Sequence, residues 1–350
     1  MNLREQLEKF EDGFLSPHAM RSSQSKGRRI KEPECTIRPA FQRDRDRILY
    51  SKAFRRLKHK TQVFLAPIGD HYRTRLTHTL EVSQIARSMA KALLLNEDLT
   101  EAIALGHDLG HTPFGHAGEA TLNQLLPGGF KHWQQSLRVV DELEREGRGL
   151  NLTYEVRMGI WGHSKGRANF LDLPAHVTDL TREAQLVRAA DLMAYLAHDA
   201  DDAIRGGVLV AADLPQQVRE RLGSRLSQQI RGMVQDLIEQ TLANGGGIAM
   251  SDEVSQTMLL FREFLYQRVY ENMDVHHSFI KAAKIVTDIF GALMEDDEFF
   301  RQQTSLHTGD IENRAQVVAD YVAGMTDSYA LALYQRYFIP EPWTQAINSR

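Results

Sequence analysis

Apolar residues recur at the spacing of an α-helix along most of this chain. The clearest case is His78, Val82, Ile85 and Met89, which fall at i, i+4, i+7 and i+11 and so share one helical face. Strand-like alternation is scarce, and no period of about 20–50 residues repeats. The pattern predicts an all-α fold and argues against a sheet protein or a solenoid.

The expected helices follow one another with short breaks. By residue range they are 41–60, 71–95, 99–109, 119–126, 132–145, 154–161, 183–204, 214–242, 252–270, 276–295 and 315–337. Two polar segments that contain glycine, 22–38 and 244–248, read as surface connections. Neither is long enough to separate two domains. We therefore expect one helical domain made of a basic N-terminal arm at 1–40, a core at 41–210, and a C-terminal helical layer at 211–350 packed on that core.

The composition excludes several other classes of protein. With 350 residues, 42% of them apolar, the chain can build a large hydrophobic core. Cys35 is the sole cysteine, which rules out an internal disulfide and a Cys-rich zinc site. No run approaches the ~18 apolar residues of a membrane span, and the charged N-terminus lacks the apolar stretch of a secretory signal. We therefore expect a cytoplasmic protein without membrane contact.

Positive charge is concentrated near the N-terminus. Residues 1–75 contain 18 Lys and Arg against 9 Asp and Glu, whereas the whole chain has a net charge of −4. A solvated basic face explains such a segment most simply. A polyanionic partner, either nucleotide phosphates or nucleic acid, is the alternative.

The segment 103–119, with the sequence IALGHDLGHTPFGHAGE, gathers many ionisable groups. His107, Asp108, His111, His116 and Glu119 are set among apolar side chains. Burying such groups is costly unless they are paired or bind a metal ion, so an ordinary core histidine is a poor explanation for the whole cluster. We expect the glycines of the segment to let the backbone turn and approach a ligand closely.

Two residues outside this segment complete a set of metal ligands. His78 heads the apolar stripe upstream, and Asp191 lies in an otherwise apolar helical segment. With the adjacent pair His107-Asp108 they offer two imidazoles and two carboxylates, which suit a divalent ion such as Mn²⁺, Mg²⁺, Co²⁺, Ni²⁺, Fe²⁺ or Zn²⁺. The carboxylates would balance its charge, and a bound water could ionise near neutral pH and attack phosphorus. The sequence leaves the identity of the metal open.

These residues resemble the H…HD…D signature of the HD phosphohydrolase superfamily. Further segments narrow the resemblance: FQRDRDRI at 41–48, AFRRL at 53–57, KTQVF at 60–64, RTRLTH at 73–78, the stretch 106–118, ADLMAYLAHD at 190–199 and NRAQVVADYVAGMTD at 313–327. Together they are similar to the dGTP triphosphohydrolase family, in its bacterial dGTPase-like type 2 branch. The resemblance covers about residues 25–340.

The resemblance implies an HD-domain helical phosphohydrolase fold and the hydrolysis of a dNTP, dGTP among them, to deoxynucleoside and triphosphate. It implies that the metal is bound by His78, His107, Asp108 and Asp191, and that Arg75 clamps triphosphate oxygens. It also implies a catalytic cluster of His111, His116, Glu119 and His132. Within this cluster we assign His116 as the general acid for the 5′-oxygen of the leaving deoxyribose, with Glu119 holding its charge and tautomer.

Substrate contacts follow from the same resemblance. It implies that Gln62 and Asp199 lie near the 3′-hydroxyl, that Tyr195 packs on the deoxyribose, and that phosphates and base are met by Arg262 and Tyr270. Asp201 and Asp202 compete with Asp199 for its role. Some relatives carry a lysine directly after the last metal aspartate, where this chain has Leu192. We therefore expect the triphosphate charge to be met by Arg55, Arg56, Lys58 or Arg262.

The resemblance further implies a homo-oligomer, often a hexamer, with effector dNTP sites between subunits. Two other functions stay open. One is a different HD enzyme, a nucleotidase or phosphodiesterase, which would use the same metal and Arg75 but cut the phosphate chain elsewhere. The other is a nucleotide- or DNA-binding regulator with weak nucleic-acid binding, suggested by the basic N-terminal third. The complete metal set and His116 argue against a regulator, because binding alone needs no general acid.

Overall fold

The computed structural model describes residues 1–62, 73–164, 177, 179–304 and 313–340. Helices make up the regular structure of these residues, apart from two isolated bridges, Arg28–Thr153 and Thr61–Thr74. The α-helices are α1 Leu3–Phe14, α2 Ala40–Leu49, α3 Lys52–Arg56, α4 Arg75–Ala92, α5 Glu97–Gly106, α6 Gly115–Leu125, α7 His132–Arg138, α8 Glu144–Gly147, α9 Tyr154–Gly162, α10 Arg182–Arg205, α11 Gln216–Arg221, α12 Leu226–Ala243, α13 Asp252–Leu265, α14 Met273–Glu295, α15 Asp297–Thr304, α16 Arg314–Ala323 and α17 Asp327–Phe338. The expected all-α class is confirmed.

Several of the expected long helices are broken by capping residues. The range 41–60 divides because the Ser51 hydroxyl accepts from Phe54 N–H and so starts a new helix, α3. The range 315–337 divides in the same way at Thr326, whose side chain accepts from Tyr329 N–H at the start of α17. The range 214–242 divides before α12, where Gly223 has a φ of +90°. Helices α1 and α15 were not among the expected helices.

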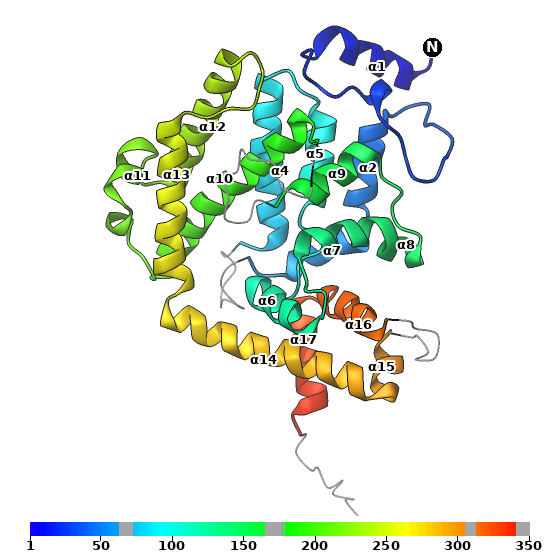
Figure 1. Ribbon diagram of the computed structural model, residues 1–350, viewed down its shortest axis with the longest axis vertical. Helices are drawn as coiled ribbons and strands as arrows, with labels where there is room; N and C mark the ends of the chain where they lie inside the picture. The colour runs from blue at the N-terminus through cyan, green and yellow to red at the C-terminus, as the bar shows by residue number, and fades with distance from the viewer. Residues whose placement is uncertain (63–72, 165–176, 178, 305–312, 341–350) are drawn as a thin grey trace, which may run out of the picture.

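The main hydrophobic core is built around α10, which runs through the middle of the molecule (Figure 1). This helix packs against α4, α5, α9 and α12. Leu186, Met193 and Ala197 are all buried on it, as expected for a helix that is apolar around most of its circumference. Because α4 and α10 carry His78 and Asp191, and His107 and Asp108 directly follow α5, the packing of these three helices brings the predicted metal ligands together.

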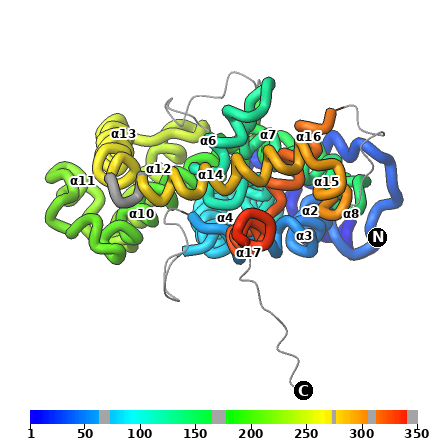
Figure 2. Tube along the Cα trace, turned by 90° about the horizontal axis from the view of Figure 1, so that it is seen from below, coloured from blue at the N-terminus to red at the C-terminus, as the bar shows by residue number. Residues whose placement is uncertain are grey.

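A second core forms where the C-terminal helices meet α6. Ile289, Phe300, Val318 and Leu333, from α14, α15, α16 and α17, pack in one buried cluster with Leu122 of α6. Figure 2, a view from below, shows α14 running past α6, α15, α16 and α17, which it contacts. In contrast, α12 and α13 belong to the main core. The region 211–350 therefore contributes to both cores.

The basic N-terminal arm is tied to the core by ion pairs. Arg28 pairs with the buried Asp44, and Arg47 and Arg43 both reach Glu32. The hydroxyl of Ser25 donates to Glu155 of α9 at 2.6 Å. The range 22–38 is thus anchored rather than loose, and these arginines have carboxylates of this chain as their partners.

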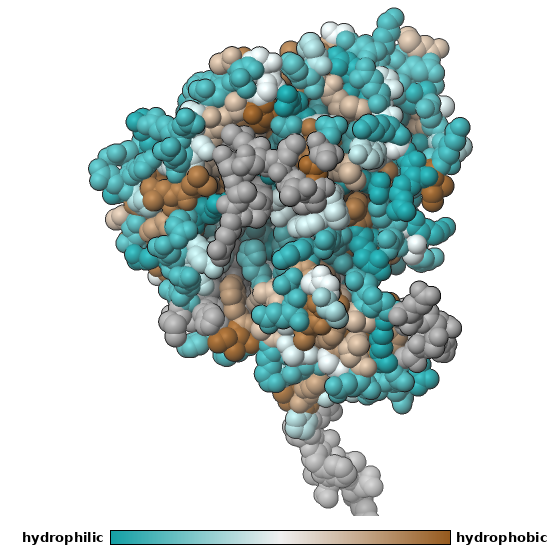
Figure 3. Space-filling view, in the orientation of Figure 1, coloured by the Kyte–Doolittle hydropathy of each residue, from teal (hydrophilic) through white to brown (hydrophobic). Residues whose placement is uncertain are grey.

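Polar side chains dominate the face shown in Figure 3, and apolar ones form separate patches. Within the described residues, no helix is both long and apolar enough to cross a bilayer.

Candidate active site

His107 and Asp108 directly follow α5, and the residues at the two ends of this helix set where it begins and ends. Asn96 accepts from Leu99 N–H to cap α5, and the helix ends at Gly106, immediately before His107 and Asp108. At Gly110 a Cβ atom would lie only 2.1 Å from the backbone nitrogen of Ser136. Gly110 therefore allows this loop to pack against α7. The expectation that it leaves room for a ligand is wrong, because the space is filled by the protein's own backbone.

The four predicted metal ligands meet at one point. Nε2 of His78 lies 3.3 Å from Oδ1 of Asp191 and 4.0 Å from Oδ2 of Asp108. Nε2 of His107 lies 3.3 Å from Oδ1 of Asp108 and 3.8 Å from Oδ1 of Asp191. Ligand atoms of His78, His107 and Asp108 all fall within 4.8 Å of one another, and these three side chains are buried.

The protonation of these ligands fits a divalent cation. His107 donates from Nδ1–H to the carbonyl of Ala104 at 2.6 Å, which leaves the lone pair on Nε2. That nitrogen is buried and has no hydrogen-bond partner among the described residues. Burial raises the pKa of Asp108, but the neighbouring His107 and His111 and the Arg75 guanidinium outweigh it and hold this pKa well below its usual range. A lone pair without a partner beside an ionised carboxylate is a donor set that a metal ion satisfies.

A cavity of about 200 Å³ opens on this cluster. Most of the residues predicted to act on substrate line it. The lining is Gln62, Arg75, His78, Asp108, His111, His116, His132, His163, Ser164, Asp191, Leu192, Tyr195 and Arg262. The structure therefore gathers residues from α4, α6, α7, α10 and α13 around one space. His107, Glu119 and Asp199 are not part of this lining, and Tyr270 lines an adjoining cavity.

His132 is held between an anion and a second imidazole. Its Nδ1–H donates to the Glu119 carboxylate at 3.0 Å, and its Nε2 lies 3.1 Å from Nε2 of His163. His163 donates its own Nδ1–H to the carbonyl of Ile160, so its Nε2 accepts from His132. Burial lowers the pKa of His132, but the Glu119 charge more than offsets this and raises it. Both nitrogens of His132 thus carry protons that are already donated.

The predicted pairing of Glu119 with His116 is wrong in this structure. Glu119 also accepts from the backbone N–H of His132, so its carboxylate is committed to His132. No hydrogen bond to the ring nitrogens of His116 occurs within the described part of the chain. The His116 ring is exposed to the cavity while protein surrounds it, and burial lowers its pKa.

Two tyrosines and an aspartate lie at one end of the cavity. The Tyr270 hydroxyl donates to the Asp199 carboxylate, and burial raises the pKa of Asp199 to about 7. The rings of Tyr195 and Tyr270 are parallel, with an angle of 2° and 6.2 Å between centroids. Of the competing carboxylates, Asp201 and Asp202 instead pair with Arg73.

A second, more apolar cavity of about 480 Å³ adjoins the first. His116 and Tyr195 line both. The remaining walls of the second cavity are Ala117, Ala120, Thr121, Gln124, Tyr266, Tyr270, Phe279, Ile280 and Ala283. Together the two cavities form a polar compartment at the metal ligands and an aromatic one beyond Tyr195.

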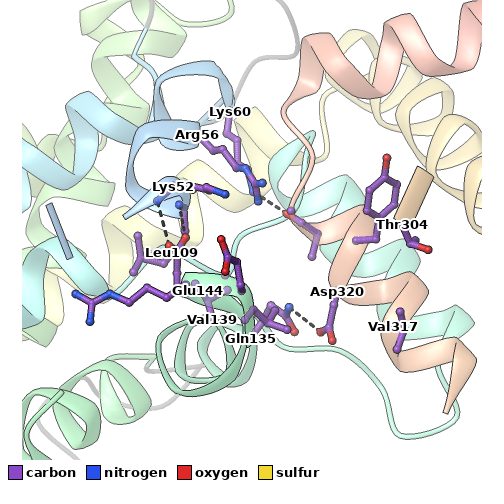
Figure 4. Close-up of a pocket in the computed structure, with 18 of the residues that line it drawn as sticks. Lys52, Arg56, Lys60, Leu109, Gln135, Val139, Glu144, Thr304, Val317 and Asp320 are labelled. Atoms are coloured by element: carbon purple, nitrogen blue, oxygen red, sulfur yellow. Dashed lines mark hydrogen bonds between the residues drawn. The ribbon is translucent and has the colours of Figure 1, made fainter. Parts of the chain in front are cut away.

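Among the four cations proposed to meet the triphosphate, Arg262 lines the polar cavity. Arg55 is turned toward the carbonyls of Tyr50 and Ser51. Arg56 lines a separate cavity of about 390 Å³ on the other side of the HD loop, shown in Figure 4 with Lys52 and Lys60. Lys60 is buried there and donates to the carbonyls of His111 and Ala323, so it braces the HD loop.

The C-terminal helices also hold the site. Asp327, at the start of α17, accepts from Phe114 N–H at 2.9 Å and from Thr61 N–H at 3.0 Å. Phe114 has a φ of +62° at the turn into α6, a conformation that costs free energy without such support. Gln62 directly follows Thr61. One C-terminal carboxylate thus fixes both the loop before His116 and the segment that carries Gln62.

Comparison with known proteins matches this architecture. Residues 75–196 match the HD domain, and residues 248–336 match the phosphohydrolase-associated domain. The chain is 51% identical over 349 residues to the deoxyguanosinetriphosphate triphosphohydrolase-like protein of Desulfatibacillum aliphaticivorans, covering 98% of this chain and 99% of that one. This chain belongs to the deoxyguanosinetriphosphate triphosphohydrolase-like family.

Other relatives in this family are similar over the same length. The protein of that name from Caldanaerobacter subterraneus subsp. tengcongensis is 50% identical and covers 98% of both chains. The one from Clostridium tetani is 43% identical and covers 97% of both. Membership in an HD-domain family supports a phosphohydrolase, and HD domains bind divalent metal ions through clusters of the kind found here.

Three residues at or beside the site were not predicted from the sequence. His163 and Ser164 follow α9 directly and enter the cavity from there. The sequence did offer a signal for His163: with Ser164 it forms a polar pair directly after a helix whose last turn contains the apolar Ile160. His198 escaped although it lies seven residues after Asp191, on the same face of α10. Its Nδ1 lies 3.4 Å from Nδ1 of His78.

Proposed function

We propose that this protein hydrolyses a dNTP to the deoxynucleoside and inorganic triphosphate. The observation that carries the proposal is a pair of adjoining cavities that share His116 and Tyr195: metal ligands, two arginines and histidines line the polar cavity, and tyrosines line the apolar one. The polar compartment suits a phosphate chain, and the aromatic one suits a nucleobase. The printed names of the relatives support the same activity.

A divalent ion would be held by His78, His107, Asp108 and Asp191. When bound, it would polarise the α-phosphate and lower the pKa of the attacking water. The protein would supply the carboxylates of Asp108 and Asp191 and the imidazoles of His78 and His107. These side chains are held by the packing of α4, α5 and α10. Asp108 also accepts from Arg75 at 2.9 Å, and this contact orients the guanidinium along the cavity.

Arg75 and Arg262 would bind the non-bridging oxygens of the triphosphate. A guanidinium presents several N–H donors in a planar fork, which matches pairs of phosphate oxygens. Leu192 lines the same cavity and contributes no charge. Tight binding of the triphosphate therefore depends on these two arginines and on the cationic His132.

His116 would protonate the leaving group. Water attacks the α-phosphorus, the bond from phosphorus to O5′ breaks, and a proton must reach the 5′-alkoxide, a poor leaving group. His132 already donates both of its protons to Glu119 and His163, whereas the His116 ring faces the cavity. The negative charge of a bound triphosphate would raise the pKa of His116 and so favour the protonated form.

The sugar would lie between the two compartments. There the Tyr195 ring would pack against C2′, and Gln62 would lie near the 3′-hydroxyl. Asp199 would act through Tyr270, because the Tyr270 hydroxyl donates to it. The base would then extend toward Tyr266 and Phe279, with Gln124 as a polar group beside it.

Product identification tests the proposal directly. Metal-reconstituted protein is incubated with each dNTP and rNTP, singly and in mixtures, in water enriched in ¹⁸O. Intact triphosphate that contains ¹⁸O, with unlabelled deoxynucleoside, is the expected result. Orthophosphate or pyrophosphate would instead support an HD nucleotidase or phosphodiesterase. DNA binding with steep salt dependence and no turnover would support a regulator.

A further inference from the structure

A buried arginine holds the end of α9 beside the polar cavity. Arg188 lies on α10, one turn before Asp191, and is 2% exposed. Its Nη1 donates to the carbonyl of Gly162 at 2.5 Å and to the carbonyl of Ser164 at 3.1 Å. These two carbonyls flank His163, so one guanidinium nitrogen fixes the backbone on both sides of that residue.

Local contacts fix the orientation of the His163 ring. The ring is buried, and its Nδ1–H donates to the carbonyl of Ile160, in the last turn of α9, at 2.7 Å. The opposite ring nitrogen, Nε2, lies 3.1 Å from Nε2 of His132. On its other side, His132 is tied to the Glu119 carboxylate. The His132 ring is therefore held at both nitrogens, and one of its two anchors is the segment that Arg188 clamps.

Stability alone does not explain an arginine at this position. A guanidinium loses its hydration when it is buried, and well-packed apolar residues of similar volume often stabilise a core equally well. The neighbours of Arg188 on α10 are such residues, since Leu186, Val187 and Ala189 are all buried. What the guanidinium adds is a rigid donor group directed at two particular carbonyls.

We propose that Arg188 and His163 are positioning residues that set the place of the His132 ring in the polar cavity. His163 contacts His132 directly, and Arg188 acts through the backbone of His163. Because Arg188 shares α10 with Asp191, the clamp also sets the distance from His132 to the metal ligands. In the proposed function, on which this inference rests, His132 meets the triphosphate. A shift of about 1 Å in such a group can lower a rate about 10²-fold.

Two pairs of variants separate the acceptor atom from the clamp. His163→Gln keeps an acceptor oxygen near the place of Nε2, whereas His163→Leu removes it at similar volume. Arg188→Lys keeps a cationic donor for the two carbonyls, whereas Arg188→Met removes it. Arg205→Met, which removes a half-exposed arginine from the same helix, is the control. Thermal melting checks that each variant is folded.

We measure kcat and KM for a dNTP, inhibition by inorganic triphosphate, and metal content. His163→Leu and Arg188→Met should lower kcat/KM about 10–100-fold and weaken inhibition by triphosphate. Metal content should be unchanged, because no metal ligand is altered. His163→Gln and Arg188→Lys should recover most of the loss, and Arg205→Met should behave as the unmodified protein.

Proton exchange measures the contact itself. In Mg²⁺-loaded protein labelled with ¹⁵N-histidine, the ring N–H between His132 and His163 should exchange slowly with water. Its signal should be lost in His163→Leu and should exchange faster in Arg188→Met, while the ring N–H that binds Glu119 remains visible.

Two results would overturn the proposal. One is full kcat/KM and full triphosphate inhibition in folded His163→Leu or Arg188→Met. The other is an equal loss in His163→Leu and His163→Gln, which would mean that the acceptor atom is irrelevant. If the unmodified protein cleaves no dNTP, the proposed function fails, and proton exchange still tests the clamp. Unchanged slow exchange in Arg188→Met would then remove Arg188 from the positioning role.

Discussion

The Glu119 carboxylate accepts two hydrogen bonds from His132, one from its backbone N–H and one from its ring Nδ1–H, each at 3.0 Å. The sequence could not indicate this pairing, because His132 comes close to Glu119 of α6 only when the loop between α6 and α7 is folded. The pairing makes His132 a fixed positive charge at the cavity, stacked on His111 with 4.0 Å between ring centroids.

Replacing Glu119 by Gln should therefore move the pH dependence of turnover. The pKa of His132 is raised by Glu119, so the imidazolium is present below that raised value and is lost as pH rises through it. Without the carboxylate, burial and Arg75 lower the pKa of His132. The basic limb of the kcat profile should then shift to lower pH, and kcat near neutral pH should fall on the order of 10² because a stabilising positive charge is lost. Glu142→Gln, a surface change near α7, is the control. An unshifted limb would mean that the charge of His132 is irrelevant.

Asp108→Ala should abolish metal binding. Asp108 contributes one of two anionic ligands, so its loss removes a ligand atom and leaves the ion with too little compensating charge. Elemental analysis after metal loading should show an empty site and no turnover, whereas Glu101→Ala on the outer side of α5 should retain both. Full metal content in Asp108→Ala would remove Asp108 from the ligand set.

His116→Ala should retain metal and nucleotide but lose turnover by about 10²–10⁴. Because the ring faces the cavity, its removal leaves room that added imidazole can fill, and partial rescue by imidazole is expected. His59→Ala, an exposed histidine outside the site, serves as the control. A nearly unchanged kcat would show that another group or water protonates the 5′-oxygen.

The extent of sequence prediction follows from how each residue reaches the site. His78, Asp191 and Tyr195 lie on continuous helices, so helical periodicity alone places them on inward faces, and the structure brings them to one cavity. His107 and Asp108 adjoin one another in the chain. The features that could not be predicted depend on contacts between segments that are distant in the sequence. They are the pairing of Glu119 with His132, the position of His163 at the end of α9, and the direction of the Arg56 side chain.

Glycine roles were misjudged for a similar reason. A glycine next to ionisable residues suggests space for a ligand, but at Gly110 the space belongs to α7. Sequence shows that a Cβ is absent without showing which atoms take its place. The basic N-terminal arm is a second case in which the sequence does not show the partners, because Arg28 pairs with Asp44 and Arg29 with Asp141, both in other parts of the chain.

Tyr195→Ala should raise hydrolysis of rNTPs relative to dNTPs. The Tyr195 ring lines the polar cavity and is parallel to the Tyr270 ring, with 6.2 Å between ring centroids. A 2′-hydroxyl would meet this ring and lose a hydrogen-bond partner, which costs on the order of 1–3 kcal/mol. Tyr195→Phe keeps the ring and should keep the discrimination, so the ratio of kcat/KM for dGTP and GTP across the three proteins tests the idea. Equal cleavage of both by the unmodified protein would contradict it.

Asp327→Asn should weaken the site from a distance. Asp327 is buried and accepts from Phe114 N–H with one oxygen and from the N–H and hydroxyl of Thr61 with the other. An amide replaces one of these acceptors by a donor, so at least one buried N–H loses its partner, at about 1–3 kcal/mol. The loop through Phe114 should loosen, because its left-handed backbone loses support. We expect a lower Tm, and a fall in kcat with metal content unchanged, since no metal ligand is touched. Asp297→Asn, which affects a surface pair with Arg314, should change neither. If Asp327→Asn lowers Tm but leaves kcat intact, the C-terminal helices stabilise the fold without positioning His116.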